Sequence, residues 1–110
     1  MKIEMVPFTS INWDGIPQTL HSGETGFATW RTVEKGNLRV RLVEYSPGYL
    51  ADHWCARGHV IHILEGEMVS ELKDGTKSYL KAGMTYMMSD DDANPHRSFT
   101  ENGVTLFIVD

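Results

Sequence analysis

The sequence predicts an all-β fold, either a sandwich or a barrel, and two observations carry this prediction. Turn-forming residues recur at short intervals through the 110 residues, among them Asp14-Gly15, Gly36-Asn37, Pro47-Gly48, Asp74-Gly75 and Asn102-Gly103. The segments between these turns are short and rich in β-branched and aromatic residues, and no long segment keeps the 3.6-residue period of a helix. Short strands separated by regular turns are typical of sandwiches and barrels.

Seven segments are expected to form strands: residues 27–33, 38–45, 59–66, 67–73, 77–82, 84–89 and 104–109. Segment 38–45 alternates apolar residues with Arg39 and Arg41, which predicts a strand whose arginines lie on a solvent-facing side. Residues 73–76, Lys-Asp-Gly-Thr, predict a hairpin turn. A helix of one or two turns is compatible with the N-terminal segment.

The composition predicts one domain, residues 1–110, with enough apolar side chains (41%) to bury a core. The net charge is −5 and the lysines and arginines are scattered, which argues against nucleic acid or a membrane as partner. No apolar segment is long enough to span a bilayer, and residues 1–13 lack the features of a signal peptide. Because the single cysteine, Cys55, cannot form an internal disulfide, we expect a cytoplasmic protein.

Residues 51–67 hold three of the five histidines and the only cysteine. In a strand, side chains two residues apart share a face, so His53 and Cys55 would point the same way. His59 follows a break at residues 57–58 and would return to the same interior if the two strands pair. His96 joins them from a distant segment. Imidazole and thiolate are ligands of late first-row metals and are unsuited to magnesium or calcium.

Residues 48–66 resemble the first motif of the cupin superfamily, and residues 83–100 resemble the second. The residues that fall on these motifs are Gly48, His53, Cys55, His59, Gly66, Gly83 and His96. The resemblance implies a single-domain cupin-like β-barrel, also described as a double-stranded β-helix or jelly roll. It also implies a metal site formed by His53, Cys55, His59 and His96. Residues 52–55, Asp-His-Trp-Cys, are similar to a permutation of the Asp-His-Cys-Trp motif of a bacterial cupin subgroup.

The chain departs from the cupin pattern at two of the four ligand positions. Cys55 stands where a second histidine is usual, and His59 stands where a glutamate is usual. Both replacements are still metal-ligand types, which favours a site that is altered but retained. A Cys55 thiolate would restore the negative charge that the glutamate supplies in the family.

Each of these residues also has a purely structural interpretation. His53 and His96 could be core or rim histidines, and His59 could cap a strand end. Cys55 could be inert packing, as most buried cysteines are. His62 has the opposite strand parity to His59 and is expected to lie outside the site. Tyr86 and the methionines at 84, 87 and 88 are expected to fill the core or to line an apolar pocket.

The resemblance implies an enzyme that acts on a small polar organic molecule, such as an oxygenase, isomerase or decarboxylase. Its cofactor would be a divalent transition metal, Zn, Fe, Ni or Mn. The candidate catalytic residues are Cys55, Tyr86 and Arg57, and Arg57 could hold an anionic substrate at the mouth of the barrel. The alternatives are a module that senses metal or redox state through a closed site, and a metal-free barrel that binds a small ligand.

We also expect a homodimer. This expectation rests on the resemblance, on the need to cover open sheet edges, and on apolar residues in the N-terminal part of the chain, namely Phe8, Ile11, Trp13 and Trp30.

Overall fold

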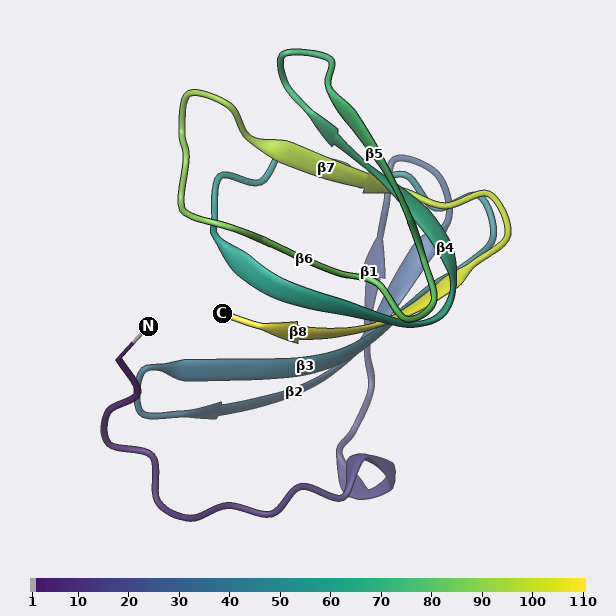
Figure 1. Ribbon diagram of the computed structural model, residues 1–110. Helices are drawn as coiled ribbons and strands as arrows, with labels where there is room; N and C mark the ends of the chain where they lie inside the picture. The colour runs from purple at the N-terminus through teal and green to yellow at the C-terminus, as the bar shows by residue number, and fades with distance from the viewer. Residues whose placement is uncertain (1) are drawn as a thin grey trace.

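The computed structural model describes residues 2–110 and contains eight strands and one short 3-10 helix (Figure 1). The elements in chain order are η1 (Trp13–Gly15), β1 (Thr19–Ser22), β2 (Phe27–Lys35), β3 (Leu38–Tyr45), β4 (His59–Leu72), β5 (Lys77–Lys81), β6 (Thr85–Met88), β7 (His96–Phe99) and β8 (Val104–Val109). All the pairings between these strands are antiparallel, which confirms the all-β prediction. Nowhere in residues 2–110 is a helix long and apolar enough to cross a membrane. The cytoplasmic location stays a prediction.

The strands form two layers that share β4. One layer runs in the order β1-β2-β3-β8-β4, with β6 on the other side of the first half of β4. In the other layer, the second half of β4 pairs with β5 on one side and β7 on the other. Figure 1 shows β4 turning sharply between its two halves, so that the two layers face each other across the interior. The predicted segments 59–66 and 67–73 are therefore one bent strand.

The bend in β4 depends on a register shift and a glycine. The pairing with β8 shifts between Ile63 and Glu65, which marks an irregularity of the β-bulge type. Gly66 follows with a φ of +80°, and a Cβ atom at this position would collide with the carbonyl oxygen of Gly103. Only glycine satisfies both the positive φ and the close approach of the neighbouring backbone.

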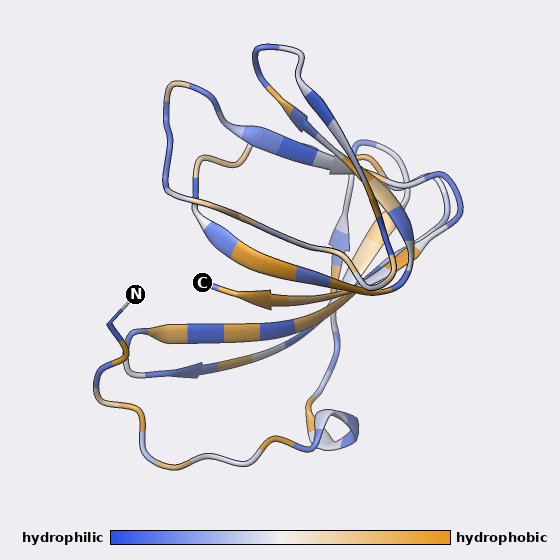
Figure 2. Cartoon of the chain, viewed as in Figure 1, coloured by the Kyte–Doolittle hydropathy of each residue, from blue (hydrophilic) through white to orange (hydrophobic). Residues whose placement is uncertain are grey.

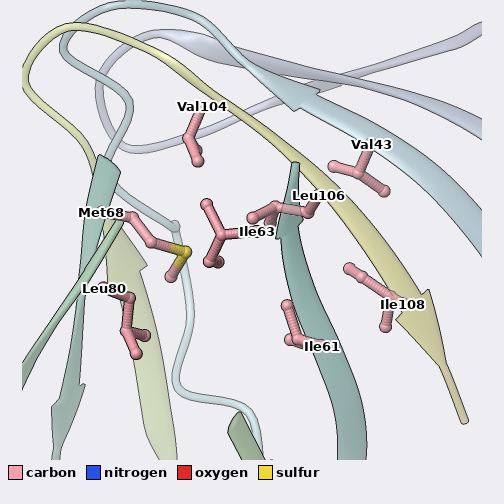
Figure 3. Close-up of a cluster of buried hydrophobic side chains, with 8 residues drawn as sticks. All are labelled: Val43, Ile61, Ile63, Met68, Leu80, Val104, Leu106 and Ile108. Carbon is pink, nitrogen blue, oxygen red and sulfur yellow. The ribbon is translucent and has the colours of Figure 1, made fainter. Parts of the chain in front are cut away.

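The apolar core fills the space between the two layers (Figure 3). Strand β8 contributes alternate residues to it, as a strand buried on one face should. The bent strand β4 contributes from both of its halves. The buried members are Val43, Ile61, Ile63, Met68, Leu80, Val104, Leu106 and Ile108.

The N-terminal segment covers the outer face of β2 and β3. Val6 and Ile11 line a common hollow with Val33, Leu38 and Val40 of these strands. Arg31 anchors the segment, because its Nη1 donates to the carbonyl oxygens of Trp13 at 2.6 Å and Ile16 at 2.9 Å. The apolar residues of β3 on this face are therefore shielded by the protein's own chain.

The predicted orientation of β3 is wrong. The alternation of apolar and polar residues is present (Figure 2), but Arg41 is 5% exposed and faces the interior. Leu38 and Val40 lie on the opposite face. The pattern shows which residues share a face, and it does not show which face is covered. Here the N-terminal segment covers one face, while Asp110 neutralises charge on the other, where it pairs with Arg41 at 3.0 Å.

Three further expectations have mixed outcomes. Tyr86 packs against the core cluster, as predicted. Met87 is 78% exposed and Met84 is 39% exposed, so these two are not core residues. Trp30, which was expected to offer apolar surface to a second subunit, points inward instead. The Arg41 guanidinium carbon lies 4.5 Å from its ring centroid.

Candidate metal centre

Cys55, His59 and His96 come together at one end of the barrel. Their candidate ligand atoms all lie within 4.8 Å of one another, and Cys55 Sγ is 3.6 Å from His59 Nε2. His59 opens β4 and His96 opens β7. Cys55 lies in the irregular segment 51–58 and forms an isolated β-bridge with His96. In this bridge the Cys55 amide donates to His96 O at 2.7 Å, and the His96 amide donates to Cys55 O at 2.9 Å.

Asp110 orients the His59 imidazole. The Nδ1 of His59 lies 2.8 Å from Asp110 Oδ2, and because a carboxylate can only accept here, Nδ1 carries the proton. The deprotonated Nε2 then faces Cys55. A carboxylate behind the imidazole is the usual way in which proteins fix the orientation of a metal-binding histidine. The His96 ring is nearly perpendicular to that of His59, with an interplanar angle of 89°.

The Asp110 carboxylate is buried among arginines. Arg39 donates to both of its oxygens at 2.8 Å, and Arg41 donates to one at 3.0 Å. The Nε of Arg57 lies 3.7 Å from the same carboxylate. Burial alone would raise the pKa of Asp110, but the hydrogen bond from Arg39 and the charge of Arg41 outweigh it and hold this pKa well below its usual range. Three cations thus surround one anion, which leaves this end of the barrel electropositive.

Both histidines of the cluster favour their neutral form. Burial is the main cause that lowers the pKa of His59, although the hydrogen bond to Asp110 opposes it. Burial also lowers the pKa of His96 to about 4, with a further contribution from His59. Neutral imidazole is the form that binds metals, so near neutral pH neither histidine has to lose a proton first.

The donor set fits a late first-row divalent ion. One sulfur and two imidazole nitrogens suit zinc, iron, nickel or copper, whereas magnesium and calcium prefer oxygen. A tetrahedral ion takes four donors, and catalytic zinc sites commonly use three from the protein and one from water or substrate. Cys55, His59 and His96 supply three.

The structure does not bring His53 into this cluster. Apart from the bridge at Cys55, segment 51–58 is not a strand, so the rule that residues two apart share a face does not apply to it. The His53 side chain is 74% exposed, and its Nδ1 lies 2.6 Å from Asp52 Oδ1. Its role as a fourth ligand stays a prediction. His62 lies outside the cluster, as expected, and pairs with Thr85 at 2.7 Å.

The three candidate catalytic residues occupy different levels of the barrel. Cys55 belongs to the metal cluster. Arg57 lies at the rim, where its side chain is 56% exposed. Tyr86 lies deeper, half-buried against the core, and burial raises the pKa of its hydroxyl above the ordinary value. Asp110 is a lone carboxylate after an apolar strand, and no motif around it points to a role in the site. The predicted solvent-facing orientation of Arg41 is wrong.

Segment 51–58 is held over the barrel by Trp54. Its ring contacts two cations, since Lys73 Nζ and Arg97 Cζ are each 4.5 Å from a ring centroid. Arg97 is held in turn by Glu71, with Nε 3.2 Å from Oε1. Cation–π contacts of this kind stabilise exposed segments modestly, and here two of them act on the residue next to Cys55.

The sequence matches no protein-family model and no curated protein. The fold, however, is shared with solved structures. The polyketide cyclase RemF from Streptomyces resistomycificus superposes with a TM-score of 0.74 at 19% identity, over 94% of this chain and 78% of that chain. The cupin domain of Schizosaccharomyces pombe Cnp3 superposes with a TM-score of 0.72 at 11% identity, over 91% of this chain and 71% of that chain. A sugar phosphate isomerase from a cupin superfamily, from Silicibacter pomeroyi, superposes with a TM-score of 0.70 at 16% identity, over 92% of this chain and 74% of that chain.

These likenesses show that the chain has the cupin fold, as the resemblance of residues 48–66 and 83–100 implies. The narrower assignment to the subgroup with an Asp-His-Cys-Trp motif stays a prediction.

Proposed function

We propose that this protein binds a divalent transition metal through Cys55, His59 and His96 and uses it in a reaction on a small polar organic molecule. The observation that carries the proposal is the convergence of these three donors within 4.8 Å. Each is positioned by its own contacts: His59 by Asp110, and Cys55 and His96 by their backbone bridge. Enzymes with this fold include a polyketide cyclase and a sugar phosphate isomerase, which supports a reaction on an organic substrate.

A bound divalent ion supplies Lewis acidity to a substrate oxygen or to a water molecule. The chain's own residues have separate roles. Asp110 keeps the His59 Nε2 unprotonated and directed at the cluster. Arg57 at the rim attracts an anionic molecule to the site. Cys55 supplies the negative charge that the remaining donors of the cluster lack.

A sensing module is the second candidate, and the observation that favours it is the chemistry of Cys55. This thiol is half-buried and lies 3.6 Å from an imidazole nitrogen, so a peroxide could oxidise the metal-bound thiolate to a sulfenic acid, be reduced to hydroxide, and so release the metal. A fourth protein donor would close the coordination shell and favour sensing over catalysis.

Elemental analysis of protein purified without an affinity tag or chelator tests the metal site. We expect near-stoichiometric metal in the wild type and its loss in Cys55→Ser and His96→Ala. His62→Ala is the matched control, because His62 faces away from the cluster, and it should retain the metal. Replacement by Co²⁺ should give a thiolate-to-metal absorption band that Cys55→Ser abolishes. Metal-free wild-type protein that folds and melts normally would contradict the proposal.

The same experiment separates the two candidates through His53→Ala. Retention of metal by this variant, with a coordination position open to added azide, supports the enzyme. Loss of metal, or a closed four-donor shell in the wild type, supports the sensing module.

A further inference from the structure

A thioether lies beside the metal cluster and has no role in the proposed function. Met88 ends β6, which runs along the first half of β4 (Figure 1), and it stands directly opposite His59 in the pairing of these strands. Side chains directly opposite each other in an antiparallel pair share a face, and their Cβ atoms are about 4.5–5.5 Å apart. The Met88 side chain therefore projects to the same side of the sheet as the His59 imidazole.

The exposure of β6 supports this placement. Thr85 and Met87 are exposed, whereas Tyr86 and Met88 are half-buried. Tyr86 packs against the core cluster from within the barrel. Because residues two apart in a strand share a face, Met88 points inward as well.

Met88 also lies close to His96. The two residues line the same cavity, which has a volume of about 220 Å³. Met88 is therefore a neighbour of both histidines of the cluster. The carboxylate that lines this cavity, Asp91, has a local role: its Oδ1 accepts from the amides of Ala93 at 3.0 Å and Asn94 at 3.2 Å and so stabilises its own turn.

The donors gathered at this point are soft. Within residues 2–110, the cluster consists of one thiol and two imidazoles, and no carboxylate joins it. Thiolate and thioether ligands favour Cu⁺, whereas carboxylate and water suit harder ions. Two imidazoles, one thiolate and one weakly bound thioether are a ligand set that proteins use for copper. Zinc takes its protein ligands from cysteine, histidine and carboxylates, and a thioether adds little to its binding.

We propose that the cluster also binds Cu⁺, with the Met88 thioether as a fourth ligand beside Cys55, His59 and His96. The inference rests on the proposed function for the three donors that both ions share. A divalent ion uses these three and leaves one position for water or substrate. Cu⁺ additionally recruits Met88, whose flexible side chain and polarisable sulfur suit such contacts.

The test compares two ions in one variant of the full chain, because Cys55 alone would attract Cu⁺. Met88→Leu keeps the apolar character and nearly the volume of the side chain and removes the sulfur. Anaerobic competition with a chromogenic chelator should show Cu⁺ affinity at least about tenfold weaker, since a direct ligand should contribute no less than a supporting group around a metal. Zn²⁺ affinity should equal that of the wild type.

Unchanged Cu⁺ affinity in Met88→Leu would overturn the inference. An equal loss for Cu⁺ and Zn²⁺ would overturn it too, because it would mean that the substitution only distorts the shared donors. Met87→Leu is the matched control: Met87 is 78% exposed on the opposite face of β6, and both affinities should stay at their wild-type values.

X-ray absorption at the copper edge gives a direct measurement of the fourth ligand. In protein prepared with selenomethionine and loaded with Cu⁺, copper should have a selenium neighbour, and Met88→Leu should lack it. Copper without a selenium neighbour in the wild type would overturn the inference.

The outcomes separate this inference from the proposed function. A divalent ion in the purified protein, together with Cu⁺ binding that does not depend on Met88, would contradict this inference alone. Cu⁺ binding that depends on Met88, in protein that never retains a divalent ion, would contradict the proposed function alone.

Discussion

The carboxylate of Asp110 is the common partner of several charged and titratable side chains at one end of the barrel. Its side chain is 1% exposed and pairs with Arg39, Arg41 and the imidazole of His59. Exposed ion pairs contribute little to stability, because water and salt screen them. A buried pair is different when one partner is removed, since the other charge is left without compensation.

Asp110→Asn should therefore lower the free energy of unfolding by about 3–5 kcal/mol, because Arg41 would keep its charge in a buried position without the carboxylate. Urea denaturation of the metal-free protein measures this. Asp14→Asn changes an exposed carboxylate in η1 and serves as the control, with an expected effect within about 0.5 kcal/mol. Equal effects of the two substitutions would show that the Asp110 network does not stabilise the fold.

The same carboxylate predicts how stability depends on acid. The pKa of Asp110 is lower in the folded protein than the value of about 3.9 in an unfolded chain. Its contribution is therefore fully present above the unfolded value and is lost as the pH falls toward the folded value. Between pH 6 and pH 3 the wild type should lose more stability than Asp110→Asn, which lacks the titrating group.

At the residue scale, the sequence identified Cys55, His59 and His96 because cysteine and histidine are uncommon and form few chance clusters. The role of His53 as a ligand stays a prediction; its side chain lies away from the other three because spacing by two places side chains on one face only in a strand, and this segment is a loop. The prediction for Arg41 failed because strand alternation does not say which face is inside. The importance of Asp110 comes from contacts with strands far away in the sequence.

At the scale of elements, all seven predicted segments lie in strands, two of them in the single bent strand β4, because β-branched and aromatic residues between turns are a strong local signal. The hairpin at residues 73–76 is also confirmed, with Asp74 accepting from the Thr76 amide at 2.9 Å. Strands β1 and β7 were not predicted. Each has four residues, and TLHS and HRSF are too short and too polar to stand out from loops.

Segment 51–58 is the element whose position matters most for the site. Because Trp54 anchors it through contacts with Lys73 and Arg97, Trp54→Ala should free the segment and move Cys55 relative to the two histidines. We expect metal affinity, measured by competition with a chelator, to fall about tenfold, the effect typical of losing a supporting contact around a metal site.

Trp13→Ala is the matched control for this prediction. Trp13 packs its edge against Phe107, at 6.4 Å between ring centroids, on the outer face away from the cluster. This substitution should reduce thermal stability while metal affinity stays at the wild-type value. An unchanged affinity in Trp54→Ala would show that the Cys55–His96 bridge alone positions the thiol.

At the scale of the whole molecule, the expected homodimer stays a prediction, and the structure changes where its interface would lie. Trp30 is inside the barrel, and Ile11 and Trp13 pack against the protein's own strands, so of the four N-terminal candidates Phe8 alone is fully exposed. A different apolar row crosses the outer face of the β5-β4-β7 layer. The strand register places its members side by side: Tyr79, Val69, Phe99 and Leu50.

Sedimentation analysis tests the dimer. The molecular mass of the wild type, measured by sedimentation, should be twice that of the 12.4 kDa chain. Tyr79→Glu should shift it to the monomer, because a charge in the centre of an apolar interface is costly to bury. Phe8→Glu, at the other exposed aromatic, should leave the mass unchanged. The reverse outcome would return the interface to the N-terminal segment, and a monomeric wild type would contradict the dimer.

The bend of β4 at Gly66 has a consequence for how the molecule opens. The first half of β4 is bonded to β8 and β6, and its second half to β5 and β7. Neither layer can lose β4 while the other keeps it intact, so breathing motions that separate the layers approach the cost of unfolding the whole chain. Amide protons on both halves of β4 should therefore exchange with solvent together and late. A molecule bound near His59, at the start of this strand, would slow exchange as far away as β5.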